Sequence, residues 1–317
     1  MYFSRQNLVL SAAGMALGAM AAAAFTGRRR YDLTGKVVLI TGGSRGLGLA
    51  LASEFARKGA RIAICARDEA ELERAAESLR EAGAEVVTAV CDVSNRDSVR
   101  RMVEAVNSQL GTIDVLVNNA GEILVSPVDN LEIADFERAM AIMFWGVVYT
   151  TWEVLPQMKR AGEGRIAAIT SIGGKVSVPH LLPYSCAKFA AVGFCEGLRP
   201  ELSKHGIYVT TIAPGLMRTG SHVHAKFKGK QRRESAWFRF AATSHLTSMS
   251  MERAAQQVVQ AVERGESQKI LTTQASVMAR INGAFPGLVP DVMRIVNRVL
   301  PSGTGELQEA RTGGELA

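Results

Sequence analysis

The chain has 317 residues, of which 47% are hydrophobic and 21% are charged, so it can bury a sizeable core and is not a disordered chain. Its 37 Lys and Arg residues against 30 Asp and Glu residues give a net charge of +7, but residues 1–30 hold four Arg residues and no acid. The rest of the chain therefore carries only +3. Because that is too little for the basic stripe of a nucleic-acid-binding protein, we expect no nucleic acid among the partners.

An uncharged run of 19 residues, 8–26, lies near the start of the chain. At about 1.5 Å per residue, a helix of this length just crosses a hydrocarbon core of about 30 Å. We expect a membrane anchor, with Arg28–Arg30 keeping the body of the protein on the cytoplasmic side. Two alternatives stay open. One is a signal peptide cleaved near Ala22–Ala24, which would make the protein secreted, and the other is a peripheral amphipathic segment.

Residues 31–274 alternate short apolar segments with helical ones, and we expect them to form one domain after the N-terminal segment 1–30. Strands that alternate with helices predict an α/β fold: a doubly wound, parallel, seven-stranded sheet of the Rossmann type. The two clearest helices are predicted from Leu47 to Lys58 and from Glu69 to Ala82. The predicted strands are Val37–Thr41, Arg61–Cys65, Glu85–Val90, Ile113–Val117, Arg165–Thr170, Ile207–Ile212 and Lys269–Thr273.

Two segments depart from this alternation. Arg218–Arg233 has six Lys and Arg residues and no acid, which is typical of a solvated loop and also of a contact with anionic lipid. Residues 275–317 are predicted to be a helical extension and tail. In this extension Leu288, Val292, Val296 and Leu300 share one face, which would suit a core cover, a dimer contact or an interfacial helix.

The four cysteines show no CxxC spacing. They are Cys65, Cys91, Cys186 and Cys195. This pattern predicts buried reduced thiols rather than a disulfide framework or a zinc site, and we expect no metal.

A glycine-rich turn, Thr41–Gly48, joins the first strand to the helix that follows it. Glycines let the backbone turn sharply and approach a pyrophosphate, and the helix directs free N–H groups and its positive dipole end at that anion. Because the turn lies between a strand and a helix at the start of a βαβ run, it predicts a dinucleotide site.

This turn, with Thr41, Gly42, Gly46 and Gly48, resembles the T-G-x-x-x-G-x-G motif of the short-chain dehydrogenase/reductase family. The resemblance covers about residues 35–273. It includes an N-N-A-G segment at 118–121, a Cys-Asp-Val segment at 91–93 and a Pro-Gly pair at 214–215. It implies that the cofactor is held by Gly42, Ser44, Arg45, Gly46, Leu47, Gly48, Arg67, Asp92, Val93, Asn119, Ala120, Gly121, Tyr184, Lys188, Pro214, Gly215 and Thr219.

The end of the second strand indicates which nicotinamide cofactor is used. An NAD enzyme usually has a carboxylate there for the ribose 2′-hydroxyl, but this chain has Ala66 followed by Arg67. Arg67 and Arg45 would together suit a 2′-phosphate, since guanidinium groups form paired hydrogen bonds with phosphate oxygens. We therefore expect NADP. Asp68 keeps NAD open as the alternative, because a shift of one residue would bring it to the ribose.

Tyr184 and Lys188 are four residues apart, so they lie on one face of a helix, and Ser171 follows the fifth predicted strand. An ammonium group beside a phenol is expected to stabilise the phenolate and lower the pKa of the Tyr184 hydroxyl. The family resemblance implies that Tyr184 exchanges a proton with the substrate oxygen, that Ser171 positions this oxygen, and that Lys188 holds the nicotinamide ribose.

The sequence departs from the family pattern at one place. An Asn usually stands in an N-x-x-G pattern after the fourth strand, and its helix helps to hold a relay water. Here Met143 occupies that position, in Met143–Gly146. A thioether accepts hydrogen bonds only weakly. Either a helix distortion still offers a backbone carbonyl to the water, or the proton relay is slowed.

Together these features predict an NADP-dependent oxidoreductase that transfers hydride to or from a hydrophobic ketone, aldehyde or secondary alcohol. The mostly apolar segment 172–183 is expected to line the substrate pocket, with Trp145, His180, Leu181 and Leu182 as candidates. Trp237–Phe240 is expected to lie in a lid. The resemblance also implies a homo-oligomer. The alternative function is a membrane-tethered NADP-binding sensor or scaffold without catalysis, which Met143 would favour.

Overall fold

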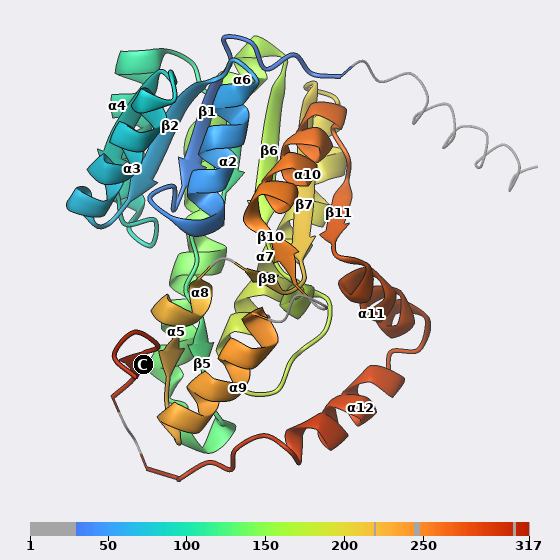
Figure 1. Cartoon of the computed structure of the whole chain (residues 1–317). Coiled ribbons are helices and arrows are strands. Elements are labelled where there is room, and N and C mark those ends of the chain that lie inside the picture. Colours follow the sequence, from blue (N-terminus) through green and yellow to red (C-terminus); the bar gives the residue numbers. More distant parts are fainter. Residues whose placement is uncertain (1–29, 219, 244–247, 307–308, 317) are drawn as a thin grey trace, which may run out of the picture.

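A computed structural model describes residues 30–218, 220–243, 248–306 and 309–316. The expected anchor at 8–26 and Thr219 lie outside these residues. Within them, no helix combines the length and the apolar character that crossing a bilayer requires. The centre of the molecule is a parallel seven-stranded sheet in the order β11-β7-β6-β4-β1-β2-β3, so the predicted sheet is confirmed (Figure 1).

The strands of this sheet follow the predicted segments closely. The main difference is the fourth strand, which begins at Val115 rather than Ile113. The backbone N–H of Ile113 donates to the side chain of Gln157, and Asp114 hydrogen-bonds to Val37 of β1. Ile113 and Asp114 therefore belong to the turn that precedes β4. The strands are β1 (Val37–Thr41), β2 (Arg61–Ala66), β3 (Val86–Val90), β4 (Val115–Asn118), β6 (Gly164–Ile169), β7 (Ile207–Pro214) and β11 (Gln268–Leu271).

Helices cover both faces of the sheet because the strand residues alternate between two apolar cores. Val38 and Ile40 of β1 pack on one side, whereas Val37 and Leu39 pack on the other. The first side is covered by α2 (Gly46–Arg57), α3 (Glu69–Glu81) and α10 (Met251–Arg264). The second side is covered by α4 (Arg96–Leu110), α6 (Gly146–Ala161) and α7 (Leu182–Ser203).

Smaller elements gather beyond the carboxyl ends of the strands, at the bottom of Figure 1. They include α5 (Ile133–Met140), α8 (Ser221–His224), α9 (Gln231–Thr243) and a small three-stranded sheet. That sheet has the order β12-β9-β5 and consists of β12 (Arg311–Thr312), β9 (Lys226–Phe227) and β5 (Leu124–Val125). Ligands of open α/β sheets bind at this end of the strands.

The C-terminal extension forms two helices rather than one continuous stretch: α11 (Thr273–Ala284) and α12 (Leu288–Asn297). Pro286 lies between them, and proline disfavours helical backbone in the residue before it. The predicted face of α12 does not cover the core, because Leu288 and Val292 are about half exposed while Val289 is buried. Leu300 lies beyond the end of the helix.

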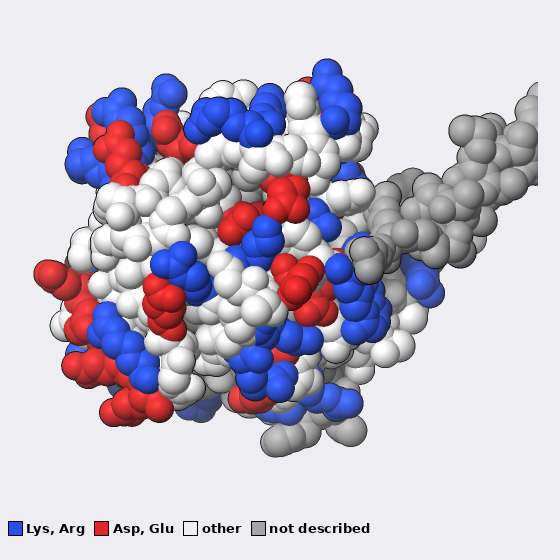
Figure 2. Space-filling view, turned by 90° about the horizontal axis from the view of Figure 1, so that it is seen from above, with Lys and Arg blue, Asp and Glu red and all other residues white. Residues whose placement is uncertain are grey.

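Charge and cysteine burial agree in part with the predictions. The face of the molecule seen in Figure 2 carries both signs of charge interspersed, without a stripe of one sign.

All four cysteines are free thiols, but Cys186 is exposed, so the prediction that all four are buried is wrong for this residue. Cys186 lies on the outward side of α7, between the inward-facing Ser185 and Ala187.

Candidate active site

The glycine turn between β1 and α2 forms an open cradle for an anion. Gly42 and Gly46 have φ angles of +65° and +55°, a region that side chains with a Cβ rarely adopt. At Gly48 a Cβ atom would overlap the carbonyl oxygen of Gly42. No side chain caps the start of α2, so its first backbone N–H groups are available to a pyrophosphate. This geometry fits a dinucleotide.

The segment 118–121 at the end of β4 is fastened to that cradle. The side chain of Asn119 donates to the carbonyl oxygens of Thr41 and Gly42 at 3.0 and 2.9 Å. In return, the Thr41 hydroxyl oxygen accepts the backbone N–H groups of Asn119 and Ala120, both at 3.0 Å. Asn119 therefore holds the shape of the cradle, a positioning role that the sequence did not reveal.

A second group of residues stands beside the cradle, where α3 begins. The Arg45 guanidinium donates to one carboxylate oxygen of Glu71 at 2.8 Å, and the Ser44 hydroxyl donates to the other at 2.8 Å. Partial burial opposes ionisation of Glu71, but Arg45 and Ser44 hold its pKa below the ordinary value. Glu71 is thus an anion that competes for Arg45, and no motif in the sequence marks it.

Arg67 and Asp68, which follow the end of β2, have different roles. Asp68 caps α3, because its carboxylate accepts the backbone N–H of Glu71 at 2.8 Å. Arg67 is exposed and makes no hydrogen bond or ion pair with any described residue. Its positive charge lowers the pKa of the nearby Asp92 carboxylate. Partial burial opposes ionisation of Asp92, but the hydrogen bonds from Ser94 and the charge of Arg67 keep this pKa below its ordinary value.

Ser171, Tyr184 and Lys188 are brought together by β6 and the start of α7. The Ser171 hydroxyl accepts the backbone N–H of Gly173 at 3.0 Å and lies in hydrogen-bonding reach of the Tyr184 hydroxyl. Lys188 is one helical turn beyond Tyr184, with its Nζ 5.7 Å from the centre of the phenol ring. This Nζ donates to the carbonyl oxygen of Ile169 at 2.8 Å. The three side chains form one cluster at the carboxyl end of the sheet.

Burial decides the ionisation of this cluster. It raises the pKa of Tyr184, although the hydrogen bond with Ser171 acts in the opposite direction. The prediction that Lys188 lowers the pKa of the Tyr184 hydroxyl is therefore wrong. Burial also lowers the pKa of Lys188 to about 8. A phenol with a raised pKa stays protonated at neutral pH, which makes Tyr184 a proton donor.

We expect Lys188→Met to stabilise the fold at pH 7 by about 1 kcal/mol, because a buried charge costs free energy that a thioether does not. The loss of the bond to Ile169 offsets part of this gain. The folded-state pKa of about 8 is below the ordinary 10.5, so below pH 8 the wild type carries the full penalty. The penalty is relieved as the pH rises from about 8 to 10.5.

Thermal unfolding at several pH values measures this effect. The gain in melting temperature from Lys188→Met should shrink above pH 8. Lys159→Met is the matched control, since Lys159 is exposed on α6 and pairs with no described carboxylate, and it should change stability by less than about 0.5 kcal/mol. A gain that does not depend on pH would contradict the argument.

Met143 lies in a π-helical turn, Ala141–Trp145, between α5 and α6. Its side chain is 1% exposed. A Cβ placed on Gly121 would be 3.6 Å from the Met143 sulfur and 3.7 Å from the Nζ of Lys188, so the thioether faces the lysine across Gly121. π-Helical turns are rare and are frequent at functional sites. A distortion of the helix is therefore present at this position without Asn.

We accordingly expect Met143→Asn to change kcat by less than about threefold. It should destabilise the fold by about 1–3 kcal/mol, because an amide would enter a buried apolar cluster with Ala139 and Ala187. Steady-state kinetics and thermal unfolding test both parts. A tenfold faster variant would show that the sulfur slows the proton relay.

A cavity of about 240 Å³ lies beside Tyr184. The expected candidates Trp145, His180, Leu181 and Leu182 do not line it. Five of its ten lining residues are charged, so this cavity does not have apolar walls. The lining residues are Glu122, Leu124, Asp135, Arg138, Ala139, Met143, Tyr184, Lys226, Glu309 and Ala310. Residues 175–180, which include His180, and Leu182 instead line a second cavity of about 880 Å³.

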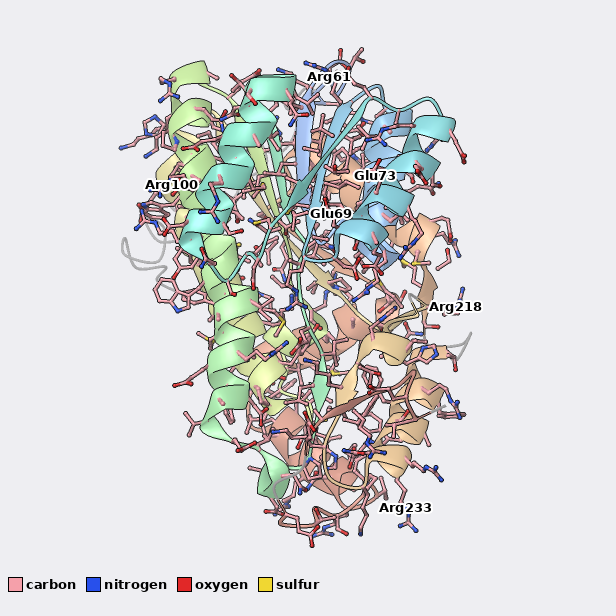
Figure 3. All side chains as sticks on the ribbon, turned by 90° about the vertical axis from the view of Figure 1, so that its left-hand side faces the viewer. Arg61, Glu69, Glu73, Arg100, Arg218 and Arg233 are labelled. Atoms are coloured by element: carbon pink, nitrogen blue, oxygen red, sulfur yellow. The ribbon has the colours of Figure 1, made fainter. Side chains whose placement is uncertain are left out.

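The charges around the cavity are mostly paired. Glu122 accepts two hydrogen bonds from Arg138, at 2.7 and 2.8 Å, and its carboxylate is 3.2 Å from the Nζ of Lys226. Lys228 pairs with Asp135 at 2.8 Å. Two cations of the segment Arg218–Arg233 thus neutralise acids of the protein. Figure 3 shows Arg218 and Arg233 well apart, so this segment does not form one basic patch.

The remaining expected site residues lie at the end of β7. Pro214 is the last residue of that strand, and the backbone N–H of Gly215 donates to the carbonyl oxygen of Leu271 at 3.1 Å. A Cβ on Gly215 would overlap the Thr272 hydroxyl, so the chain passes close to β11 there. Whether Thr219 completes this part of the site stays a prediction.

Comparison with known proteins gives a consistent match. The family model "short chain dehydrogenase" matches residues 36–229. The chain is 34% identical over 256 residues to a putative oxidoreductase, SadH, of Mycobacterium tuberculosis, covering 79% of this chain and 92% of the relative. It is 40% identical over 192 residues to 11-beta-hydroxysteroid dehydrogenase 1A of Arabidopsis thaliana, covering 59% of this chain and 54% of that relative. Among solved structures, actinorhodin polyketide ketoreductase with NADPH has a TM-score of 0.65 and 30% identity, covering 76% of this chain and 97% of that one.

Proposed function

The chain belongs to the short-chain dehydrogenase/reductase family, and from this premise we propose that it is an NADP-dependent reductase of hydrophobic ketones or aldehydes. The family establishes an oxidoreductase that acts on alcohol or carbonyl groups with a nicotinamide dinucleotide. The finer proposal is carried by one observation. The Tyr184 phenol, whose pKa is raised by burial, stands beside Ser171 and the buried Lys188 at the carboxyl end of the sheet.

The roles of the three side chains follow from their geometry. When bound, the nicotinamide ring would supply or accept hydride at the substrate carbon. Tyr184 donates a proton to the carbonyl oxygen, and the Ser171 hydroxyl holds this oxygen as charge develops on it. Lys188, charged below about pH 8, would hold the nicotinamide ribose beside Tyr184.

The surroundings of Arg67 support NADP. One carboxylate oxygen of Asp68 is engaged as the cap of α3, which leaves this side chain less available to a ribose hydroxyl. Arg67 makes no ion pair with any described residue and is available to a 2′-phosphate. Glu71 opposes this preference, since it holds Arg45 at 2.8 Å.

An apolar cluster next to the cavity supports a hydrophobic substrate. β5 contributes Leu124 to the cavity, while the adjoining Ile123 and Val125 pack with Leu181 and with aromatic residues of α9. In α9, Trp237 and Phe238 lie in this cluster, whereas Phe240 is 78% exposed. The steroid named by one relative is a molecule of this apolar class.

The test is loss of NADPH absorbance when the full chain is mixed with apolar ketones and aldehydes. Turnover of any of them, faster with NADPH than with NADH, supports the proposal. Tight NADPH binding without turnover of any carbonyl would favour the alternative, an NADP-binding sensor or scaffold.

We further propose that residues 8–26 anchor the protein in a membrane with its body in the cytoplasm, and that the body forms a homo-oligomer. An exposed aromatic surface on α6 and α7 supports the second proposal. Trp152 is 53% exposed there, near Phe194, and Phe189 is 43% exposed. Intact-mass measurement on protein extracted from membranes tests the anchor, and sedimentation of the extracted protein tests the assembly.

A further inference from the structure

The C-terminal end of the chain returns to the candidate active site. We call residues 302–306 and 309–316 the C-terminal strap. In Figure 1 the strap runs from the end of α12 past α9 and ends beside α5 and α8. It is therefore placed over the carboxyl end of the sheet, where the cavity beside Tyr184 lies.

The first part of the strap is fixed to the body by a buried side chain. Asn130 is fully buried. Its amide nitrogen donates to the Thr304 hydroxyl and to the carbonyl oxygen of Glu306, both at 2.7 Å. Its amide oxygen accepts the backbone N–H of Thr304 at 3.1 Å. A buried side chain that satisfies three strap atoms makes this a specific contact rather than a loose tail.

The second part of the strap is fixed to β9 and to the end of α8. β12 pairs antiparallel with β9, with Arg311 opposite Phe227. Beyond it, the backbone N–H groups of Gly313 and Gly314 donate to the carbonyl oxygens of Ala225 and Val223, both at 2.9 Å. β9 in turn pairs with β5, which follows the segment 118–121. The strap is thus the outer strand of a small sheet that reaches the site.

Between these two attachments the strap forms a wall of the cavity. Glu309 and Ala310 line it together with Tyr184 and Leu124. Leu316, near the end of the strap, packs against the buried apolar cluster of Val125, Ala225, Phe227 and Phe238. The cavity of about 240 Å³ is smaller than typical ligand sites, which enclose roughly 300–1,000 Å³.

We propose that the C-terminal strap determines which carbonyl compounds enter the site. With the strap docked, Glu309 and Ala310 wall the cavity and restrict the site to small carbonyl compounds. With the strap released, the cavity joins the apolar cluster and admits large apolar ketones. This proposal rests on the proposed reductase function and names the part of the chain that selects its substrates.

Two adjacent glycines offer a matched pair of variants in the full chain. A Cβ on Gly313 would overlap the carbonyl oxygen of His222, so Gly313→Ala should release the strap. A Cβ on Gly314 would lie 3.4 Å from the nearest atom of Val223, an ordinary contact, so Gly314→Ala should leave it docked. Hydrogen exchange of residues 309–316 reports the release, and we expect it to be about tenfold faster only in Gly313→Ala.

Equilibrium dialysis with cyclohexanone and with progesterone then measures size selection without turnover. We expect Gly313→Ala to raise the ratio of progesterone to cyclohexanone affinity about tenfold, with Gly314→Ala within twofold of the wild type. Faster exchange with an unchanged ratio would overturn the proposal. If Gly313→Ala keeps the strap docked, a chain ending at Pro301 is measured in its place, and an unchanged ratio again overturns it.

A parallel assay of NADPH oxidation separates this proposal from the proposed function. If the ratio of affinities changes but no variant oxidises NADPH with either ketone, the strap selects ligands and the reductase function is wrong. If NADPH is oxidised but the ratio is the same in all variants, the reductase function stands and the strap does not select substrates.

Discussion

Tyr184→Phe is expected to lower kcat for carbonyl reduction by about 10²–10⁴-fold, the usual contribution of a positioned general acid. The variant removes one oxygen from a partly buried ring and keeps its shape, so the fold and the glycine cradle should not change. Burial raises the pKa of this phenol, which keeps it protonated at neutral pH. The proton that the substrate oxygen needs would therefore be lost with the hydroxyl. Single-turnover NADPH oxidation gives the rate.

Binding of NADPH, measured by titration, should stay within about threefold in Tyr184→Phe. Tyr149→Phe is the matched control, because the ring of Tyr149 stacks on Trp145 with their centres 5.7 Å apart, outside the cluster of Ser171 and Lys188. It should leave kcat within twofold. Equal rates for Tyr184→Phe and the wild type would exclude Tyr184 as the proton donor.

The sheet and its covering helices could be predicted because burial leaves a local pattern in the sequence. β1 and β2 are continuous apolar runs, and α3 repeats apolar residues at helical spacing. The small sheet could not be predicted in this way. β12 and β9 pair two residues each, about 85 positions apart, and such short segments carry no periodicity.

The site was predictable to the extent that its residues lie at strand ends. Ser171 and the turn Gly42–Gly48 follow strands, so the topology brings them together. Electrostatics depends on distances that the sequence does not contain. Lys188 donates to the carbonyl oxygen of Ile169, and burial rather than Lys188 sets the direction in which the pKa of Tyr184 moves. Likewise, the Glu71 carboxylate that holds Arg45 belongs to a helix 26 residues further along the chain.

Arg67→Ala is expected to raise the dissociation constant of NADPH by about 10–100-fold and to change that of NADH by less than threefold. One charged hydrogen bond to a phosphate contributes about 1.5–3 kcal/mol, and tenfold in binding corresponds to 1.4 kcal/mol. Arg67 makes no ion pair with a described residue, so its guanidinium need not leave a partner to reach the 2′-phosphate. Calorimetric titration of both cofactors gives the two constants.

Two further variants show whether Arg67 changes the dissociation constant of NADPH through its 2′-phosphate. Arg100→Ala removes an exposed cation of α4 that pairs with Asp97 at 2.8 Å, and it should leave both constants unchanged. Glu71→Gln should tighten NADPH binding severalfold, because it removes an anion beside the phosphate site and releases Arg45. Equal losses of NADPH and NADH binding in Arg67→Ala would mean that Arg67 contacts a part common to both cofactors. In that case the carboxylate of Glu71 would be the better candidate for the ribose hydroxyls, and the enzyme would use NAD.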